Sequence, residues 1–258
     1  MLGTIKLLEA ARHTPSVRAV VAISSDKCYE NREATVPYAE DAPMGGYDPY
    51  SASKGCMELA ISSYRRSFFN LQDYGSRHNV LLASARAGNV IGGGDWAEDR
   101  LVPDIMKATI AGHAVDIRNP AAVRPWQHVL EPLSGYLALG QKLLEGQVPY
   151  AEGWNFGPSP ECIFTVGDCI KALQREWREI RPVFAHNENV PHEAGILLLD
   201  SGKAQRRLGW HGVWFTDEAL RRTAAWYRDF CKAGQIDTEA DFNAYIEDAR
   251  KEGIEWTR

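Results

Sequence analysis

A run of apolar and β-branched residues turns polar at its end in Val20-Val21-Ala22-Ile23-Ser24-Ser25-Asp26-Lys27. Its apolar half predicts a short buried strand, and its polar half lies where α/β sheets hold their ligands. The same pattern predicts further strands at 80–85, 114–117, 154–156 and 197–200. Helical spacing predicts helices at 2–12, 51–69, 101–111, 129–145 and 166–180, with a further helix that Ser201 caps and helical structure after 216. Strands that alternate with helices indicate an α/β fold around a parallel sheet.

Tyr50 and Lys54 are four residues apart in a segment that predicts a helix. This spacing places both side chains on one helix face, one turn apart. An ammonium beside a phenol favours the phenolate, which can act as a base. If Ser25 holds the hydroxyl of an alcohol substrate, the three side chains could take the proton of that hydroxyl while hydride leaves its carbon. The spacing alone also fits an ordinary contact on a helix surface.

Composition excludes several classes of protein. The chain has 258 residues and a net charge of −5 without a long basic run, which argues against nucleic-acid binding. No apolar stretch reaches the length that a membrane span requires, so we expect no membrane partner. The cysteines are odd in number and form no C-x-x-C pair, so we interpret them as free thiols of a reducing cytoplasm, with neither a disulfide framework nor a metal site. They are Cys28, Cys56, Cys162, Cys169 and Cys231.

A dinucleotide-binding sheet seats the pyrophosphate on a glycine-rich turn between its first strand and helix. No G-x-G-x-x-G or G-x-x-G-x-x-G pattern precedes Val20. The glycines at 92–94 follow a later strand and lack the required spacing. We therefore interpret them as a turn that leads into a second lobe.

Several long segments together resemble the CDP-glucose 4,6-dehydratase family of the extended short-chain dehydrogenase/reductases. These segments are Ser25-Asp26-Lys27-Cys28-Tyr29, residues 44–51, Ser53-Lys54, residues 86–96 and residues 124–129. The resemblance extends from Leu2 to near the C-terminus. It implies bound NAD, a CDP-glucose substrate, a homodimer and a place in deoxysugar synthesis for lipopolysaccharide O-antigen.

The resemblance also implies how the chain is divided. Residues 1–92 would form a Rossmann-like NAD-binding domain that is incomplete at its N-terminus, because about a hundred residues of the first half of a two-half sheet are absent. Residues 93–258 would form mainly a smaller α/β substrate-binding lobe, with 125–158 returning to the sheet. A fragment, a late gene-model start and a natural shortening all remain open as explanations.

The family's reaction assigns a role to each residue around Ser25. Tyr50 would take the C4 hydroxyl proton, and Ser25 would bind the same hydroxyl. Lys54 would favour the phenolate of Tyr50 and hold the nicotinamide ribose. Asp26 would protonate the departing C6 hydroxyl and Lys27 would remove the C5 proton. Two charges at the tip of a strand also fit a solvated ion pair, which is the alternative for Asp26 and Lys27.

The resemblance assigns the substrate contacts to three further residues. Asn89 would bind the sugar or its diphosphate, and Arg124 would bind the diphosphate, which a guanidinium fits bidentately. Arg118 is a weaker candidate for the nucleotide. Arg86 is expected to pair inside the fold and His128 to be structural.

Two other functions stay open. A nucleotide-sugar epimerase or decarboxylase shares Tyr50 and Lys54 but needs no acid and base beside Ser25, so Asp26 and Lys27 argue against it. A non-catalytic remnant that binds or dimerises without NAD is the alternative of a different class.

Overall fold

The chain forms two compact units in a computed structural model that describes residues 1–33, 35–159, 163–184 and 196–257. Unit 1 comprises Met1–Gly88, Pro132–Gly157 and Leu198–His211. Unit 2 comprises Asn89–Glu131, Pro158–Leu197 and Gly212–Arg258. The expected division at residue 92, with 125–158 returning, differs from these units at residues 89–92, 125–131 and 158 and at Leu198–His211. NAD binding by the first part and substrate binding by the second stay predictions.

Unit 1 is built around a parallel sheet of three strands, which confirms the predicted α/β fold. The strands are β1 (Ala19–Ile23), β2 (Leu81–Ala87) and β7 (Gly153–Phe156), in the order β1-β2-β7. Every residue of the central strand β2 is buried. Such a strand has both faces covered, as parallel sheets require.

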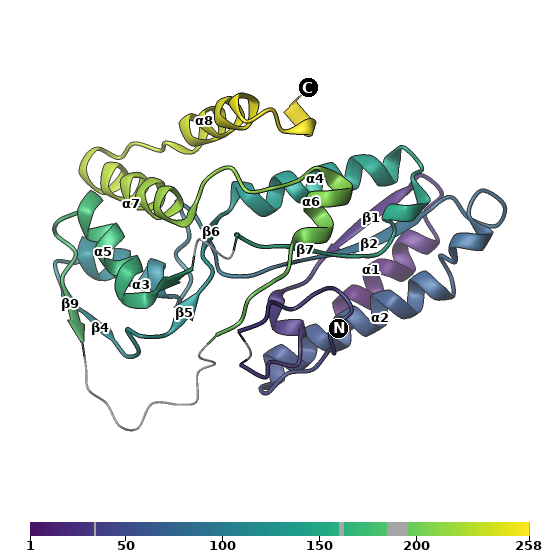
Figure 1. The fold of residues 1–258 in the computed structure, drawn as a ribbon, viewed down its shortest axis with the longest axis horizontal. Coiled ribbons are helices and arrows are strands. Elements are labelled where there is room, and N and C mark those ends of the chain that lie inside the picture. Colours follow the sequence, from purple (N-terminus) through teal and green to yellow (C-terminus); the bar gives the residue numbers. More distant parts are fainter. Residues whose placement is uncertain (34, 160–162, 185–195, 258) are drawn as a thin grey trace. The chain divides into compact units, whose positions relative to one another are not determined.

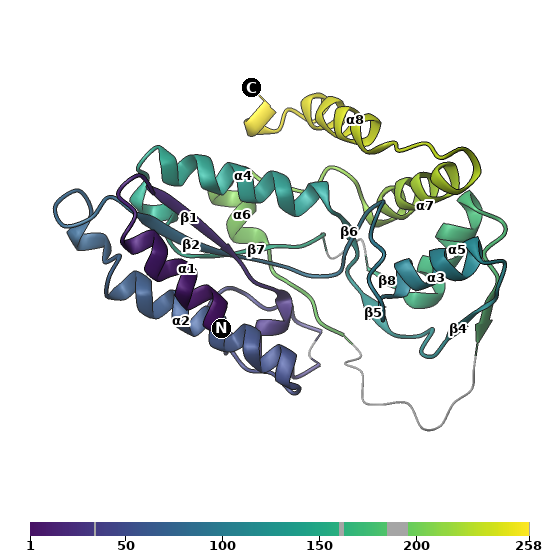
Figure 2. The same ribbon diagram turned by 180° about the vertical axis from the view of Figure 1, so that it is seen from behind.

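Helices cover both faces of this sheet, as Figures 1 and 2 show. Alternate side chains of a strand point to opposite faces, so β2 contributes to two separate cores. Leu82 packs in the core that contains Leu8 and Ile61, on the side of α1 (Leu2–Arg12) and α2 (Pro49–Arg66). Leu81 packs with Leu139 on the opposite side, where α4 (Leu130–Leu144) and α6 (Gly202–Leu208) lie. The sheet is thereby held as the middle layer of unit 1.

In the described ranges, unit 2 combines four helices with pairs of very short strands. The helices are α3 (Leu101–Ile110), α5 (Val166–Glu176), α7 (Thr216–Ala233) and α8 (Thr238–Lys251). The strands pair as β3 (Val90–Ile91) with β6 (Gln127–His128), β4 (Val115–Ile117) with β9 (Pro182–Phe184), and β5 (Val123–Arg124) with β8 (Phe164–Thr165). Only the last pair is antiparallel among the pairs that the described residues form. Short 3₁₀ helices complete the described chain: η1 (Asp26–Cys28), η2 (Leu71–Asp73), η3 (Val148–Tyr150) and η5 (Glu255–Thr257).

Two details near α6 differ from the expectation. The strand expected at 197–200 is reduced to a single bridge between Tyr38 and Leu199. Ser201 precedes α6, but its side chain does not cap the helix, because its hydroxyl instead accepts a hydrogen bond from Gly157 N at 2.8 Å. The carboxylate of Asp200 accepts from Gly202 N at 2.7 Å. A long-range contact has therefore taken the side chain that local sequence assigned to the cap.

The described residues include four of the five cysteines. The thiols of Cys28, Cys56, Cys169 and Cys231 are free there, and Cys162 lies outside the described part. No helix in the described ranges has the length and apolarity needed to cross a membrane.

Candidate active site

The segment that follows β1 folds into a tight turn at the end of the strand. Ser25 caps the 3₁₀ helix η1: its hydroxyl accepts a hydrogen bond from Lys27 N at 3.2 Å and donates one to Asp26 Oδ1 at 2.9 Å. Serine is favoured at this position because its oxygen accepts a hydrogen bond from a backbone N–H that has no partner within the helix. The turn thus holds Ser25, Asp26 and Lys27 together at the carboxyl end of the parallel strand β1. The sequence predicts a buried strand here, but only Ala22 of β1 is buried and Ile23 is exposed.

Asp26 is a buried carboxyl group with one open oxygen. Only 2% of the residue is exposed, and its Oδ2 atom has no hydrogen-bond partner among the residues the structure describes. The Lys27 Nζ atom lies 3.7 Å from Oδ2, within ion-pair range. A buried carboxyl oxygen without a hydrogen bond is costly, so this oxygen needs an explanation beyond packing. This burial does not fit the alternative of a solvated ion pair at a strand tip.

Gly88 makes the space that Asp26 fills. A Cβ atom at Gly88 would lie 2.2 Å from Asp26 Oδ2, a distance that real Cβ atoms do not show. Any side chain at this position would therefore push the carboxyl group away. Gly88 belongs to segment 86–96, which carries the family resemblance, but the sequence alone gave it no role.

Helix α2 begins so that Tyr50 lies in its first turn. Asp48 caps the helix, since its Oδ1 atom accepts hydrogen bonds from Tyr50 N at 2.8 Å and Ser51 N at 3.0 Å. Pro49 follows at the helix position that best tolerates proline. The hydroxyl and backbone N–H of Ser51 lower the pKa of Asp48, so the cap carries a negative charge at the positive helix end.

Tyr50 and Lys54 lie on one face of α2, where their spacing predicts them. The Lys54 Nζ atom is 5.5 Å from the centroid of the Tyr50 ring. Tyr50 is 52% exposed, so a ligand can reach its hydroxyl. The arrangement offers an ammonium next to an accessible phenol.

Close backbone packing brings α2 against the turn after β1. A Cβ atom at Gly55 would lie 2.8 Å from Gly45 O and 3.3 Å from Cys28 O, and Gly45 N donates to Cys28 O at 2.9 Å. The helix that carries Tyr50 and Lys54 therefore lies beside η1, which carries Asp26 and Lys27. These predicted catalytic residues and Ser25 all belong to unit 1.

A buried ion pair connects α2 with β2, and the sequence analysis anticipated only its arginine. Arg86 pairs inside the fold, as expected, through an Nη2 contact of 2.9 Å with Glu58 Oε2. The sequence analysis did not single out Glu58. The sequence could have indicated Glu58, because this carboxylate lies between the apolar residues Met57 and Ile61 and one helical turn after Lys54.

The predicted substrate contacts lie in unit 2. Asn89 has a left-handed backbone with φ of 48°, and its Nδ2 atom is buried without a hydrogen-bond partner among the described residues. Arg124 is partly buried in β5 and donates to Val123 O at 2.8 Å, while Arg118 is exposed after β4. His128 packs edge-on against Trp214, and burial lowers its pKa to about 4. All three ligand assignments stay predictions.

The described residues hold no cluster of histidine, cysteine and carboxylate side chains that could bind a metal ion. His186 and His192, to which the sequence analysis assigned no role, lie outside the described part.

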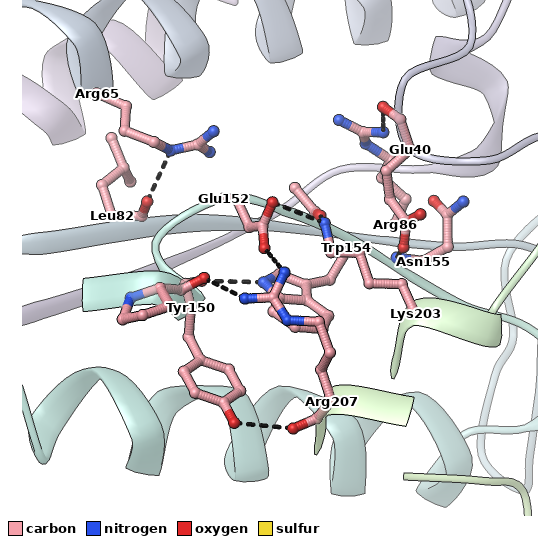
Figure 3. Close-up of polar contacts among 12 residues, drawn as sticks. Glu40, Arg65, Leu82, Arg86, Tyr150, Glu152, Trp154, Asn155, Lys203 and Arg207 are labelled. Atoms are coloured by element: carbon pink, nitrogen blue, oxygen red, sulfur yellow. Dashed lines mark hydrogen bonds and ion pairs between the residues drawn. The ribbon is translucent and has the colours of Figure 1, made fainter. Parts of the chain in front are cut away.

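A second charged cluster in unit 1 has a structural explanation. Glu152 pairs with Lys203 at 3.0 Å and with Arg207, which binds α6 to the start of β7 (Figure 3). Arg207 also lies over the stacked rings of Tyr150 and Trp154. Satisfied in this way, the cluster offers no free charge to a ligand.

Comparisons with known proteins identify the family of the chain. The family model described as GDP-mannose 4,6 dehydratase matches residues 1–223. A CDP-glucose 4,6-dehydratase of Salmonella typhimurium is 50% identical over 228 residues, which are 88% of this chain and 63% of that protein. A dTDP-glucose 4,6-dehydratase of Streptomyces griseus is 28% identical over 227 residues, 87% of this chain and 63% of the relative. The chain thus spans less than two thirds of the length of both relatives.

Solved structures show the same fold at low identity. A UDP-glucose 4-epimerase of Thermotoga maritima, solved with UDP-glucose, gives a TM-score of 0.74 at 20% identity over 90% of this chain and 70% of that one. A dTDP-glucose 4,6-dehydratase of Bacillus anthracis, solved with NAD, gives 0.69 at 20% identity over 89% of this chain and 67% of that one. At this identity the likeness establishes the Rossmann-like fold.

Proposed function

We propose, since the chain belongs to the GDP-mannose 4,6 dehydratase family, that it performs the chemistry of a CDP-glucose 4,6-dehydratase. In this reaction CDP-glucose gives CDP-4-keto-6-deoxyglucose and water. The observation that carries the proposal is the buried Asp26 carboxyl group, which has one open oxygen and lies in the turn against the helix of Tyr50 and Lys54. Oxidation at C4 needs the phenol and the ammonium, and loss of water needs an acid beside them.

The residues of α2 suit the nicotinamide end of NAD. Lys54 is only partly exposed while its ammonium lies near the accessible Tyr50 ring, so one ribose could contact both. When bound, NAD would accept a hydride from C4 and give it back at C6. We propose Tyr50 and Lys54 as the contacts of this chain with the cofactor.

The residues of unit 1 then divide the proton transfers. Ser25 binds the C4 hydroxyl and the Tyr50 phenolate takes its proton as the ketone forms. A proton passed from the Lys27 ammonium to the Asp26 carboxylate, 3.7 Å away, would give the neutral amine and the carboxylic acid that elimination needs. Lys27 then takes the C5 proton, which the new ketone makes acidic, and Asp26 gives its proton to the C6 hydroxyl as it leaves as water. Lys27 returns its proton to C5 as C6 is reduced. Asn89, Arg118 and Arg124 are the proposed contacts of the sugar nucleotide.

The variant Asp26→Asn tests the proposal, because it should separate oxidation from elimination. The purified chain is mixed with CDP-glucose and NAD, and product and reduced cofactor are followed by mass and absorbance. We expect the variant to oxidise C4 once and stop, so that reduced cofactor accumulates. The exposed Asp41→Asn serves as the matched control and should turn over normally. Water loss at the normal rate in Asp26→Asn would contradict the role of Asp26.

The same experiment separates the alternatives. An epimerase or decarboxylase would give a product that keeps the C6 hydroxyl, and a buried acid with an open oxygen argues against it. A non-catalytic remnant would retain no nucleotide through purification and would give no product with NAD added.

We further propose that the protein acts as a homodimer in the cytoplasm. Exposed apolar side chains on unit 1 helices, Leu2 and Leu7 on α1 and Leu59 on α2, support a partner surface there. The free thiols among the described cysteines support a reducing compartment. Sedimentation of the purified chain measures the oligomeric state, and a monomer at micromolar concentration would contradict the dimer.

A further inference from the structure

A carboxylate on α2 is enclosed by donors from β2 and from the residue that follows β1. Glu58, which is 4% exposed, accepts from Arg86 Nη2 at 2.9 Å and from the Ser84 hydroxyl at 2.8 Å through Oε2. Its Oε1 atom accepts from the hydroxyl of Ser24. Burial alone would raise the pKa of Glu58, but the hydrogen bond and charge of Arg86 hold it below the ordinary value. The carboxylate is therefore charged and fully partnered.

The guanidinium of Arg86 is fixed on its other side as well. Its Nη1 atom donates to the hydroxyl of Tyr29 at 2.6 Å and to Glu40 O at 3.0 Å, a contact visible in Figure 3. The Tyr29 hydroxyl in turn donates a hydrogen bond to Asn155 Oδ1 on β7 at 2.7 Å. Arg86 cannot move without breaking contacts with separate parts of unit 1.

This network contacts the residues on both sides of the proposed catalytic turn. Ser24 directly precedes Ser25, and Tyr29 directly follows η1, so the segment Ser25–Cys28 is held at both ends. Glu58 belongs to the same helix as Tyr50 and Lys54. One ion pair thus connects the turn that holds the acid to the helix that holds the base.

We propose that Glu58 and Arg86 are positioning residues that hold Ser25, Asp26 and Lys27 in place relative to Tyr50. The proposal rests on the proposed function, and neither residue touches the substrate in it. An apolar contact would allow the helix to slide against the strands, whereas charged hydrogen bonds fix direction and distance. A displacement of about 1 Å can cost about 100-fold in rate, so such fixation matters for catalysis.

The double variant Glu58→Leu/Arg86→Met separates positioning from a purely structural role. A purely structural role predicts an unchanged kcat as long as the variant folds. Replacing a buried ion pair by apolar groups of similar size is often neutral or stabilising for the fold. We therefore expect the double variant to keep its melting temperature, while kcat falls about 100-fold with KM for CDP-glucose unchanged. A kcat equal to that of the wild type in a folded double variant would overturn the proposal.

Arg65→Met is the matched control. Arg65 is partly buried on α2 and also connects the helix to β2, through a hydrogen bond from Nε to Leu82 O at 2.9 Å (Figure 3). This bond to Leu82 touches neither end of the segment Ser25–Cys28. We expect this variant to melt at a lower temperature and to keep kcat. A 100-fold loss here too would mean that any weakening of the helix–sheet contact is enough, and it would overturn the specific role of Glu58 and Arg86.

A measurement without substrate separates this proposal from the proposed function. In isotope-labelled chain, the amide signals of 25–27 and the ring signal of Tyr50 report their positions directly. We expect them to shift in the double variant and to stay in place in Arg65→Met. If the double variant does not fold, Arg86→Lys replaces it, because lysine keeps the charge but cannot reach both Glu58 and Tyr29. Unshifted signals would reject the positioning role even if the wild type turned over, and shifted signals would support it even if the wild type did not.

Discussion

Unit 1 and unit 2 each bury a glutamate, and the two carboxyl groups behave in opposite ways. Glu58 in unit 1 faces the guanidinium of Arg86, which lowers its pKa against the effect of burial. Glu131 in unit 2 accepts hydrogen bonds from the backbone of Val213 and Trp214 and from the Tyr245 hydroxyl, none of which carries a charge. Burial therefore dominates and raises the pKa of Glu131 to about 7. The difference shows that a neighbouring cation, and not the number of hydrogen bonds, keeps a buried carboxylate ionised.

Asp26 adds a third arrangement, because one of its oxygens has no hydrogen bond in the described residues. Glu58 has hydrogen-bond partners on both oxygens, whereas Asp26 Oδ2 has only the Lys27 ammonium within ion-pair range. Unit 1 thus contains one buried carboxylate with partners on both oxygens, on α2, and one with an oxygen that lacks a hydrogen bond, in η1.

The largest expected effect is on stability, in the single variant Glu58→Leu. It leaves the charge of Arg86 buried without its carboxylate, and we expect the free energy of unfolding to fall by about 3–5 kcal/mol. Urea unfolding measures the change. Adding Arg86→Met should restore most of the loss, because no buried charge is then left unpaired. A loss below about 1 kcal/mol in the single variant would show that Arg86 does not depend on Glu58.

Glu131 predicts a pH dependence with the opposite origin. In the unfolded chain its carboxyl group ionises near its ordinary pKa, while the folded chain keeps the proton up to about pH 7. The unfolded state therefore releases protons first, and the free energy of unfolding should fall by about 3 kcal/mol as the pH rises through this window.

The variant Glu131→Gln is the reference for this effect, because its side chain cannot ionise. Unfolding curves between pH 4.5 and pH 7 are compared for the two proteins. We expect the wild type to lose more stability than the variant over this range. Equal slopes would show that Glu131 ionises in the folded chain as readily as in the unfolded one.

The smallest expected effect is that of Gly88→Ala on the elimination step. The added Cβ displaces the Asp26 carboxyl group from its place, and we expect water loss to slow about tenfold, or about 1.4 kcal/mol, with C4 oxidation unchanged. Rapid mixing separates the two steps. Gly140→Ala is the control, because a Cβ there would meet Val21 only at 3.8 Å. An equal slowing of both steps would mean that Gly88 supports the whole turn and not Asp26 in particular.

Local patterns predicted most of unit 1. The helix at 2–12 has the predicted bounds, and the strands at 20–23 and 80–85 agree within about two residues with Ala19–Ile23 and Leu81–Ala87. Their apolar runs determine the structure because both faces of the sheet are covered. The turn of Ser25 was readable for the same reason, since a polar end to such a run marks the ligand edge of the sheet.

Contacts between distant segments could not be predicted. Nothing local connects Glu58 with Arg86, 28 positions away, or Gly88 with Asp26. The helix expected at 166–180 ends at Glu176, because Trp177 leaves the helical backbone and is buried. The two-residue strands of unit 2 depend on pairing partners, so short sequences such as Val90-Ile91 carry too little pattern to indicate them.

The most direct test of the whole account is the turnover of Tyr50→Phe with CDP-glucose and NAD. Loss of one oxygen removes the base from a helix that is otherwise intact, and we expect kcat to fall about 1,000-fold. Tyr64→Phe on the same helix is the control, because it removes only a hydrogen bond to Glu9 at 2.8 Å. Unchanged turnover in Tyr50→Phe, or no conversion of CDP-glucose by the wild type, would contradict the account.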